Sequence, residues 1–169
     1  MFLRLFYVIR FLVMAVSLLI LPSIAFGLDS QYFVGHGALD IFNQEGFLVT
    51  PRWVQIWILI LIGTFIAGFY FAWKHSIARW AVGGFIFSMT MGHTIFGLLN
   101  LPFLGGSIAI MHLVCWSPAL LIFLIKRPYF NCNERMSFRA WSGLMTSVLI
   151  FSFVFDIKDA LIYISHVAI

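Results

Sequence analysis

Hydrophobic residues in this chain gather in long uncharged blocks that are separated by short polar segments. Residues 53–73 carry no charged side chain and have a Trp at each end, and residues 80–125 contain no Asp, Glu, Lys or Arg. A helix of about 20 apolar residues crosses the hydrocarbon core of a bilayer. The second block is too long for one crossing, and its Asn, Pro and Gly residues at 100–107 predict a helical hairpin.

The pattern therefore predicts an all-α, polytopic membrane helical bundle. We expect four transmembrane helices in residues 28–169, preceded by an outer-side connector at 28–52. The expected spans are about 53–73, 80–101, 107–125 and 140–164.

The first 27 residues allow two interpretations. Arg4 and Arg10 resemble the basic start of a signal peptide, residues 11–21 its apolar region, and Pro22 precedes a small-residue cleavage site. The start is itself apolar, so an uncleaved first transmembrane helix, the fifth of the bundle, is the alternative. Both interpretations place residue 28 on the outer side.

Composition agrees with a membrane protein and excludes several other classes. The chain is 63% hydrophobic and 9% charged, whereas soluble domains contain about 25% charged residues. Cys115 and Cys132 form no CxxC motif, so neither a thioredoxin-like redox pair nor a zinc ribbon is indicated.

The net charge of +4 indicates membrane topology rather than nucleic-acid binding. Basic residues stand in pairs beside the apolar blocks, at 4 and 10, 74 and 79, 126 and 127, and 135 and 139. Loops rich in Lys and Arg face the cytoplasm. We expect a multi-pass protein of the cell inner membrane with its C-terminus on the outer, periplasmic side.

Small residues predict how the second span packs. Gly84, Ser88 and Gly92 are four residues apart, a spacing that lets helix backbones approach closely in lipid. This stripe lies opposite Met89 and His93 on a helix. We therefore expect two interior faces on this span and a place near the middle of the bundle.

Polar side chains also form a stripe near the C-terminal end of the last span. Asp156, Asp159, Tyr163 and His166 fall within about 80° of arc on one helical face, and Lys158 points elsewhere. An ionisable residue inside a membrane is costly and is by default a candidate functional residue.

Helical rise places three of the ionisable residues at a similar depth. His93 lies about 20 Å from the inner side, His112 about 8 Å from the outer side, and Asp156 about 24 Å from the inner side. All three should therefore meet in the outer half of the membrane.

Such a cluster could hold a metal or haem b. Thioether, imidazole and carboxylate ligands suit copper, and Met89 and Met91 point about 200° apart, so at most one of them joins His93. The candidate metal ligands are His93, His112, Asp156, Asp159, Met89 and His166. Haem b would instead be bound between His93 and His112, with Gly92 and Gly97 leaving room for the ring.

A purely structural role is the competing interpretation. His93 could hydrogen-bond to Asn100 or Ser117, and Asp156 and Asp159 could lie close enough to the surface to remain hydrated.

The sequence contains no signature of a known catalytic site. HExxH, Gly-x-Ser-x-Gly, P-loop and dinucleotide-binding motifs do not occur, so we do not expect an enzyme in the chain by itself. We expect an accessory or cofactor-holding subunit that contacts the lipid bilayer and other membrane subunits. The alternative is a small homo-oligomeric transporter or channel that uses the same polar stripe. Nucleic acid is not an expected partner.

Overall fold

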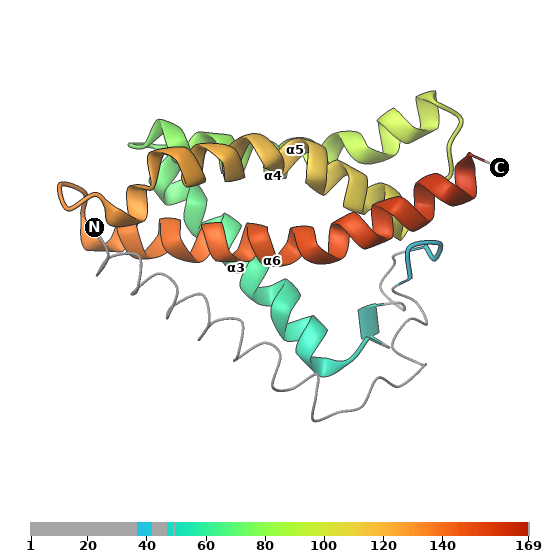
Figure 1. Ribbon diagram of the computed structural model, residues 1–169, viewed down its shortest axis with the longest axis horizontal. Helices are drawn as coiled ribbons and strands as arrows, with labels where there is room; N and C mark the ends of the chain where they lie inside the picture. Colours follow the sequence, from blue (N-terminus) through green and yellow to red (C-terminus); the bar gives the residue numbers. More distant parts are fainter. Residues whose placement is uncertain (1–36, 42–46, 49, 169) are drawn as a thin grey trace.

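The computed structural model describes residues 37–41, 47–48 and 50–168, and these residues form helices and loops without a strand (Figure 1). The predicted all-helical class is confirmed. The two interpretations of residues 1–27 lie outside the described residues. The elements are α3 (Arg52–Ala72), α4 (Ser76–Leu98), α5 (Gly105–Lys126), the short 3-10 turn η2 (Pro128–Phe130) and α6 (Met136–Val167).

Three helical segments of the described residues are long and apolar enough to cross a membrane. They are α3, α4 and the segment Gly105–Phe130, which comprises α5 and η2. The structure thus supports three of the four predicted spans. The fourth, at 140–164, lies within α6, and its crossing stays a prediction.

The helices extend beyond the predicted spans at several ends. α4 begins at Ser76 rather than at 80, and α6 runs from Met136 to Val167. The apolar pattern marks only the part of a helix that avoids charge, whereas backbone hydrogen bonding continues into polar residues at the ends.

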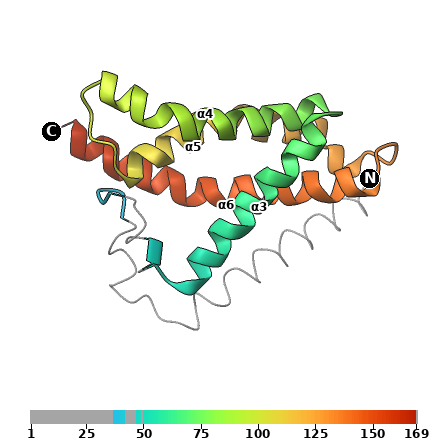
Figure 2. The ribbon, with the colours of Figure 1, turned by 180° about the vertical axis from the view of Figure 1, so that it is seen from behind.

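α4, α5 and α6 run beside one another, and α3 crosses this group at an angle (Figures 1 and 2). The α3–α4 and α5–α6 connections lie at one end of the bundle, and the α4–α5 connection and the C-terminus lie at the other. The largest buried cluster joins all four helices and includes Phe65 of α3, Ala81 of α4, Trp116 of α5 and Trp141 of α6. The Trp141 indole also donates to the carbonyl of Thr64 at 2.9 Å.

Glycine permits the closest helix contacts. A Cβ atom added at Gly84 would collide with the carbonyl oxygen of Cys115 on α5, and one added at Gly106 would collide with Tyr163 on α6. The predicted close approach at the Gly84 stripe is therefore confirmed.

The prediction of two interior faces on α4 is wrong. Ser88 and Gly92 are buried, but Met89 and His93 on the opposite side are exposed. The small residues bring α4 close to α5, and the opposite face then points away from α3 and α5, the two helices against which α4 mainly packs.

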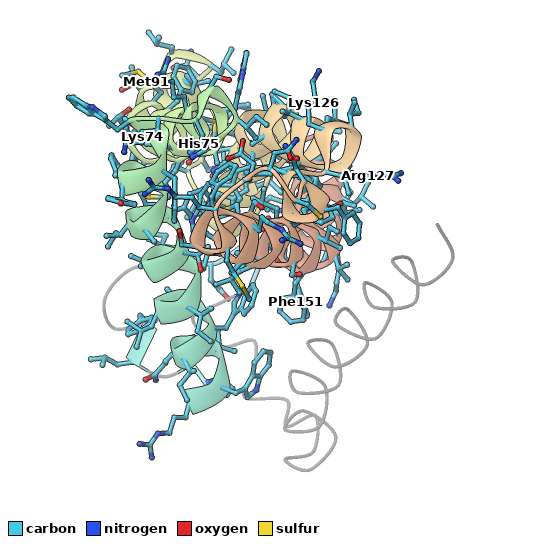
Figure 3. The ribbon with its side chains drawn as sticks, turned by 90° about the vertical axis from the view of Figure 1, so that its left-hand side faces the viewer. Lys74, His75, Met91, Lys126, Arg127 and Phe151 are labelled. Carbon is cyan, nitrogen blue, oxygen red and sulfur yellow. The ribbon has the colours of Figure 1, made fainter. Side chains whose placement is uncertain are left out.

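Basic side chains gather at the end that holds the α3–α4 and α5–α6 connections. Figure 3 labels Lys74 and His75 from the first connection, and Lys126 and Arg127 from the end of α5 and the residue after it. His75 joins the two connections, because its Nδ1 lies 3.7 Å from Oε2 of Glu134 and its ring stacks on Phe138.

Candidate functional site

His112 on α5 and Asp156 on α6 form a partly buried ionisable pair. The His112 Nδ1 lies 3.4 Å from the Asp156 Oδ1, and the two side chains are only 17% and 14% exposed. The predicted meeting of these two residues from separate helices is confirmed.

The His112 ring is held in place by its own helix. It stacks on Trp116, four residues later, with ring centroids 3.8 Å apart and planes 15° apart. Trp116 is fully buried, and its indole nitrogen donates to the Ser88 hydroxyl on α4 at 3.2 Å. The pair is thus tied to α4 as well as to α5 and α6.

Three buried polar atoms around the pair have no hydrogen-bond partner among the described residues: Nε2 of His112, Oδ2 of Asp156 and Oγ of Ser152. Buried polar atoms without partners are uncommon, because leaving them unpaired costs about 1–3 kcal/mol each. Ser152 lies four residues before Asp156 and therefore on the same face of α6.

The environment of Ser152 differs from that of its neighbours on α6. Ser142, Thr146 and Ser147 each donate to a carbonyl three or four residues earlier in the same helix, at 2.9, 2.7 and 3.1 Å. Ser152 makes no such bond. Its hydroxyl therefore has no hydrogen-bond partner among the described residues, and it lies one turn before Asp156 on the same face of α6.

This arrangement can exchange a proton. A neutral imidazole has one N–H donor and one acceptor nitrogen, whereas the imidazolium form donates from both. With Nδ1 facing the Asp156 carboxylate, a proton taken up at Nε2 produces a cation whose charge the carboxylate offsets. Uptake of one proton therefore converts a pair with a net charge of −1 into a neutral ion pair, and its release restores the single negative charge on the Asp156 carboxylate.

The rest of the polar stripe continues toward the C-terminal end of α6. Asp159 is half-buried, Tyr163 is buried and donates to the Pro102 carbonyl at 2.7 Å, and His166 is exposed. The stripe is thus interior at Asp156 and Tyr163 and leaves the interior at its end.

His93 and Met89 lie on the exposed face of α4. The His93 ring packs against Phe103 with centroids 3.8 Å apart, and Met89 is 55% exposed. Neither residue has a contact with the His112–Asp156 pair among the interactions of the described residues.

The part of the chain that the structure describes contains no group of three or more His, Cys, Asp or Glu side chains arranged to hold a metal. Of the six predicted ligands, the structure pairs only His112 and Asp156. The copper and haem b sites stay predictions. The site that the structure describes consists of two ionisable residues, His112 and Asp156.

Sequence reasoning missed two residues of the site, Trp116 and Ser152. Each stands four residues from a predicted site residue, Trp116 after His112 and Ser152 before Asp156. Helical spacing of four could have found both, because such residues lie one above the other on a helix.

No protein-family model, curated protein or solved structure matches the chain. Its function is therefore inferred from its own residues.

Proposed function

We propose that the chain is a small multi-pass subunit of a larger membrane assembly, and that its His112–Asp156 pair binds and releases a proton there. The observation that carries the proposal is the placement of this pair between α5 and α6, with one buried polar atom of each side chain unpartnered among the described residues. Ionisable groups inside membranes mark proton relays and ion pathways. Short connections between the described helices and a sequence without catalytic motifs support the role of an accessory subunit.

The proposed location is the cell inner membrane, with the basic end of the bundle in the cytoplasm. Lys74, Arg79, Lys126 and Arg127 lie in or beside the two connections at that end, and loops rich in Lys and Arg remain on the cytoplasmic side. In this orientation α6 is the fourth span, the C-terminus is on the outer side, and His112 lies about 10 Å from the outer end of α5.

Ser152 supports a second candidate, a homo-oligomeric transporter or channel. Its unpartnered hydroxyl precedes Asp156 by about one turn, and Asp159 follows by about one turn. A row of polar groups along one helix face is the arrangement that conducts protons or small cations between helices.

The mass and composition of the native assembly distinguish the two candidates. The full-length chain, tagged and extracted from its own membranes in mild detergent, should elute with a fixed partner in constant ratio if it is a subunit. A homo-oligomer that moves protons across vesicle membranes, and loses this activity in Asp156→Asn but not in His93→Gln, would establish the transporter. A monomer that neither retains a partner nor moves protons would contradict both.

A further inference from the structure

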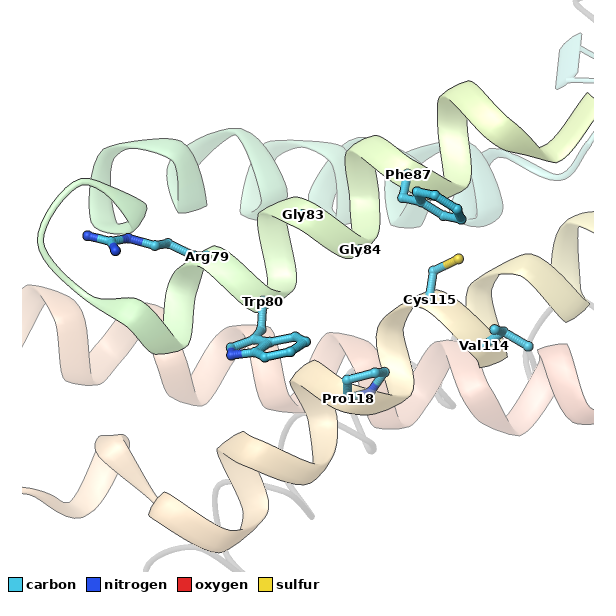
Figure 4. A pocket seen from close by; sticks show the side chains of 8 residues that line it. All are labelled: Arg79, Trp80, Gly83, Gly84, Phe87, Val114, Cys115 and Pro118. Carbon is cyan, nitrogen blue, oxygen red and sulfur yellow. The ribbon is translucent and has the colours of Figure 1, made fainter. Parts of the chain in front are cut away.

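A groove between α4 and α5 opens on the side of the bundle (Figure 4). It encloses about 490 Å³, and its lining is mainly apolar. On α4, Trp80 and Phe87 flank the groove, and Gly83 and Gly84 form its floor between them. Cys115 and Pro118 face them from α5 (Figure 4).

Adjacent glycines create the groove. Gly84 lies against the Cys115 carbonyl, so the two helices touch there, whereas a Cβ atom at Gly83 would meet no atom within 4 Å. Trp80 and Phe87 are seven residues apart and share a helix face. Two large rings about 10 Å apart thus border a stretch that has no side chain.

The mouth of the groove is basic. Arg79 lines it, and its side chain extends toward the α3–α4 connection (Figure 4). The Arg79 guanidinium donates to the carbonyls of Ala72 at 2.9 Å and Trp73 at 3.4 Å, which fixes its position at the end of α3. Lys74 is exposed in the same connection. Among the described residues no Asp or Glu lines the groove, and Glu134 at this end of the bundle lies beside His75.

The length of the groove along α4 suits a bound lipid better than a bound transmembrane helix. The groove runs along α4 from Arg79 to Phe87, a rise of about 12 Å at 1.5 Å per residue. That is close to the depth of one bilayer leaflet, about half of the ~30 Å hydrocarbon core. A partner helix crossing the membrane would need a groove along the whole thickness.

We propose that this groove binds one anionic phospholipid, with an acyl chain over Gly83 and Gly84 and the phosphate at Arg79. Basic pockets between transmembrane helices are the sites at which anionic headgroups bind, and Trp80 stands where an indole prefers to lie, at the membrane interface. This inference stands independently of the proton-binding proposal.

Native mass spectrometry of the full-length chain, titrated with phosphatidylglycerol or phosphatidylcholine, tests the site. The wild type should retain one phosphatidylglycerol in preference to phosphatidylcholine. A Cβ atom at Gly83 meets nothing within 4 Å, so Gly83→Leu places a large side chain in the groove without displacing the backbone and should abolish this retention. Gly97→Leu, another exposed glycine of α4 with nothing within 4 Å, is the matched control and should retain the lipid.

Arg79→Gln should weaken retention of phosphatidylglycerol about fivefold, the effect of one basic side chain at a membrane surface, and should leave phosphatidylcholine unchanged. Equal retention of both lipids by the wild type, or equal retention by Gly83→Leu and the wild type, would overturn the proposal. So would a Gly83→Leu variant that loses a copurifying protein while keeping its lipid, because a protein would then occupy the groove.

Discussion

At the scale of single residues, His112 and Asp156 depend on each other. The carboxylate offsets the charge of an imidazolium, and the imidazole gives the largely buried carboxylate a partner at 3.4 Å. Removal of either one leaves the other in the bundle without its partner, which costs more than the pair contributes. The stacking of His112 on Trp116 fixes the ring whether or not the carboxylate is present.

A double-mutant cycle should detect this dependence. We expect His112→Gln and Asp156→Asn each to lower the free energy of unfolding in detergent micelles. The double variant should lose less than the sum, by about 0.6–1.7 kcal/mol, which are the average and the largest coupling energies for polar contacts between membrane helices. Purely additive losses would show that the two side chains do not interact.

Replacement by alanine should affect the free energy of unfolding differently at Ser152 and at Ser142, two serines of α6. Ser142→Ala removes a hydroxyl that donates to Arg139 at 2.9 Å and should lower the free energy of unfolding by about 1 kcal/mol. Ser152→Ala removes a buried hydroxyl with no partner among the described residues and should leave that free energy unchanged or raise it. Thermal unfolding of both variants provides the comparison; a loss at Ser152 as large as that at Ser142 would mean that Ser152 is already bonded.

At the scale of elements, glycine sets the distance between helices. Gly106 lies at the start of α5, where a Cβ atom would collide with Tyr163 and with the Asp159 carbonyl of α6. Its backbone N–H also donates to the Ala38 carbonyl at 2.7 Å, which holds the loop of residues 37–41 over this contact. The contact between the start of α5 and the C-terminal part of α6 thus positions Tyr163 and the polar stripe.

Gly106→Ala should therefore destabilise the protein by about 1–3 kcal/mol, the cost of overpacking a filled contact. The control is Gly63→Ala on α3, where a Cβ atom meets nothing within 4 Å. Alanine there should raise the free energy of unfolding by about 0.5–1 kcal/mol, because glycine weakens a helix interior. Unfolding curves of equal midpoint for the two variants would contradict the assigned contact.

The sequence predicted most of the helices, and it predicted the depth of the site residues but not which helix faces meet. Uncharged blocks located α3, α4 and α5, and helical rise brought His112 and Asp156 to one level. The same rise placed His93 at that level too, but depth alone does not determine which face of a helix a neighbour covers. The Gly84–Gly92 stripe drew α5 to one side of α4 and left His93 exposed.

At the scale of the whole molecule, the two ends of the bundle differ in charge. The end with the α3–α4 and α5–α6 connections is basic. At the opposite end, the Asp40 carbonyl accepts from Gly105 at 2.9 Å, and the Asp159 backbone lies beside Gly106 at the start of α5. This asymmetry supports the proposed orientation, in which the basic end remains in the cytoplasm.

Thiol labelling on intact cells tests the orientation. Cys132 is exposed in the α5–α6 connection, so a membrane-impermeant maleimide should label it only after the membrane is permeabilised. In a Cys132→Ser background, Ser165→Cys near the C-terminus should be labelled from the periplasm without permeabilising the inner membrane. The reverse pattern would invert the topology.

Infrared difference spectroscopy of the full-length chain in lipid nanodiscs, recorded between two pH values, tests the proton-binding site most directly. We predict a shift in the carboxylate stretching bands of Asp156 as the His112 imidazolium forms beside it; this signal should disappear in Asp156→Asn and in His112→Gln and persist in His93→Gln. Identical difference spectra for the wild type and Asp156→Asn would show that the pair exchanges no proton and would contradict the proposed function.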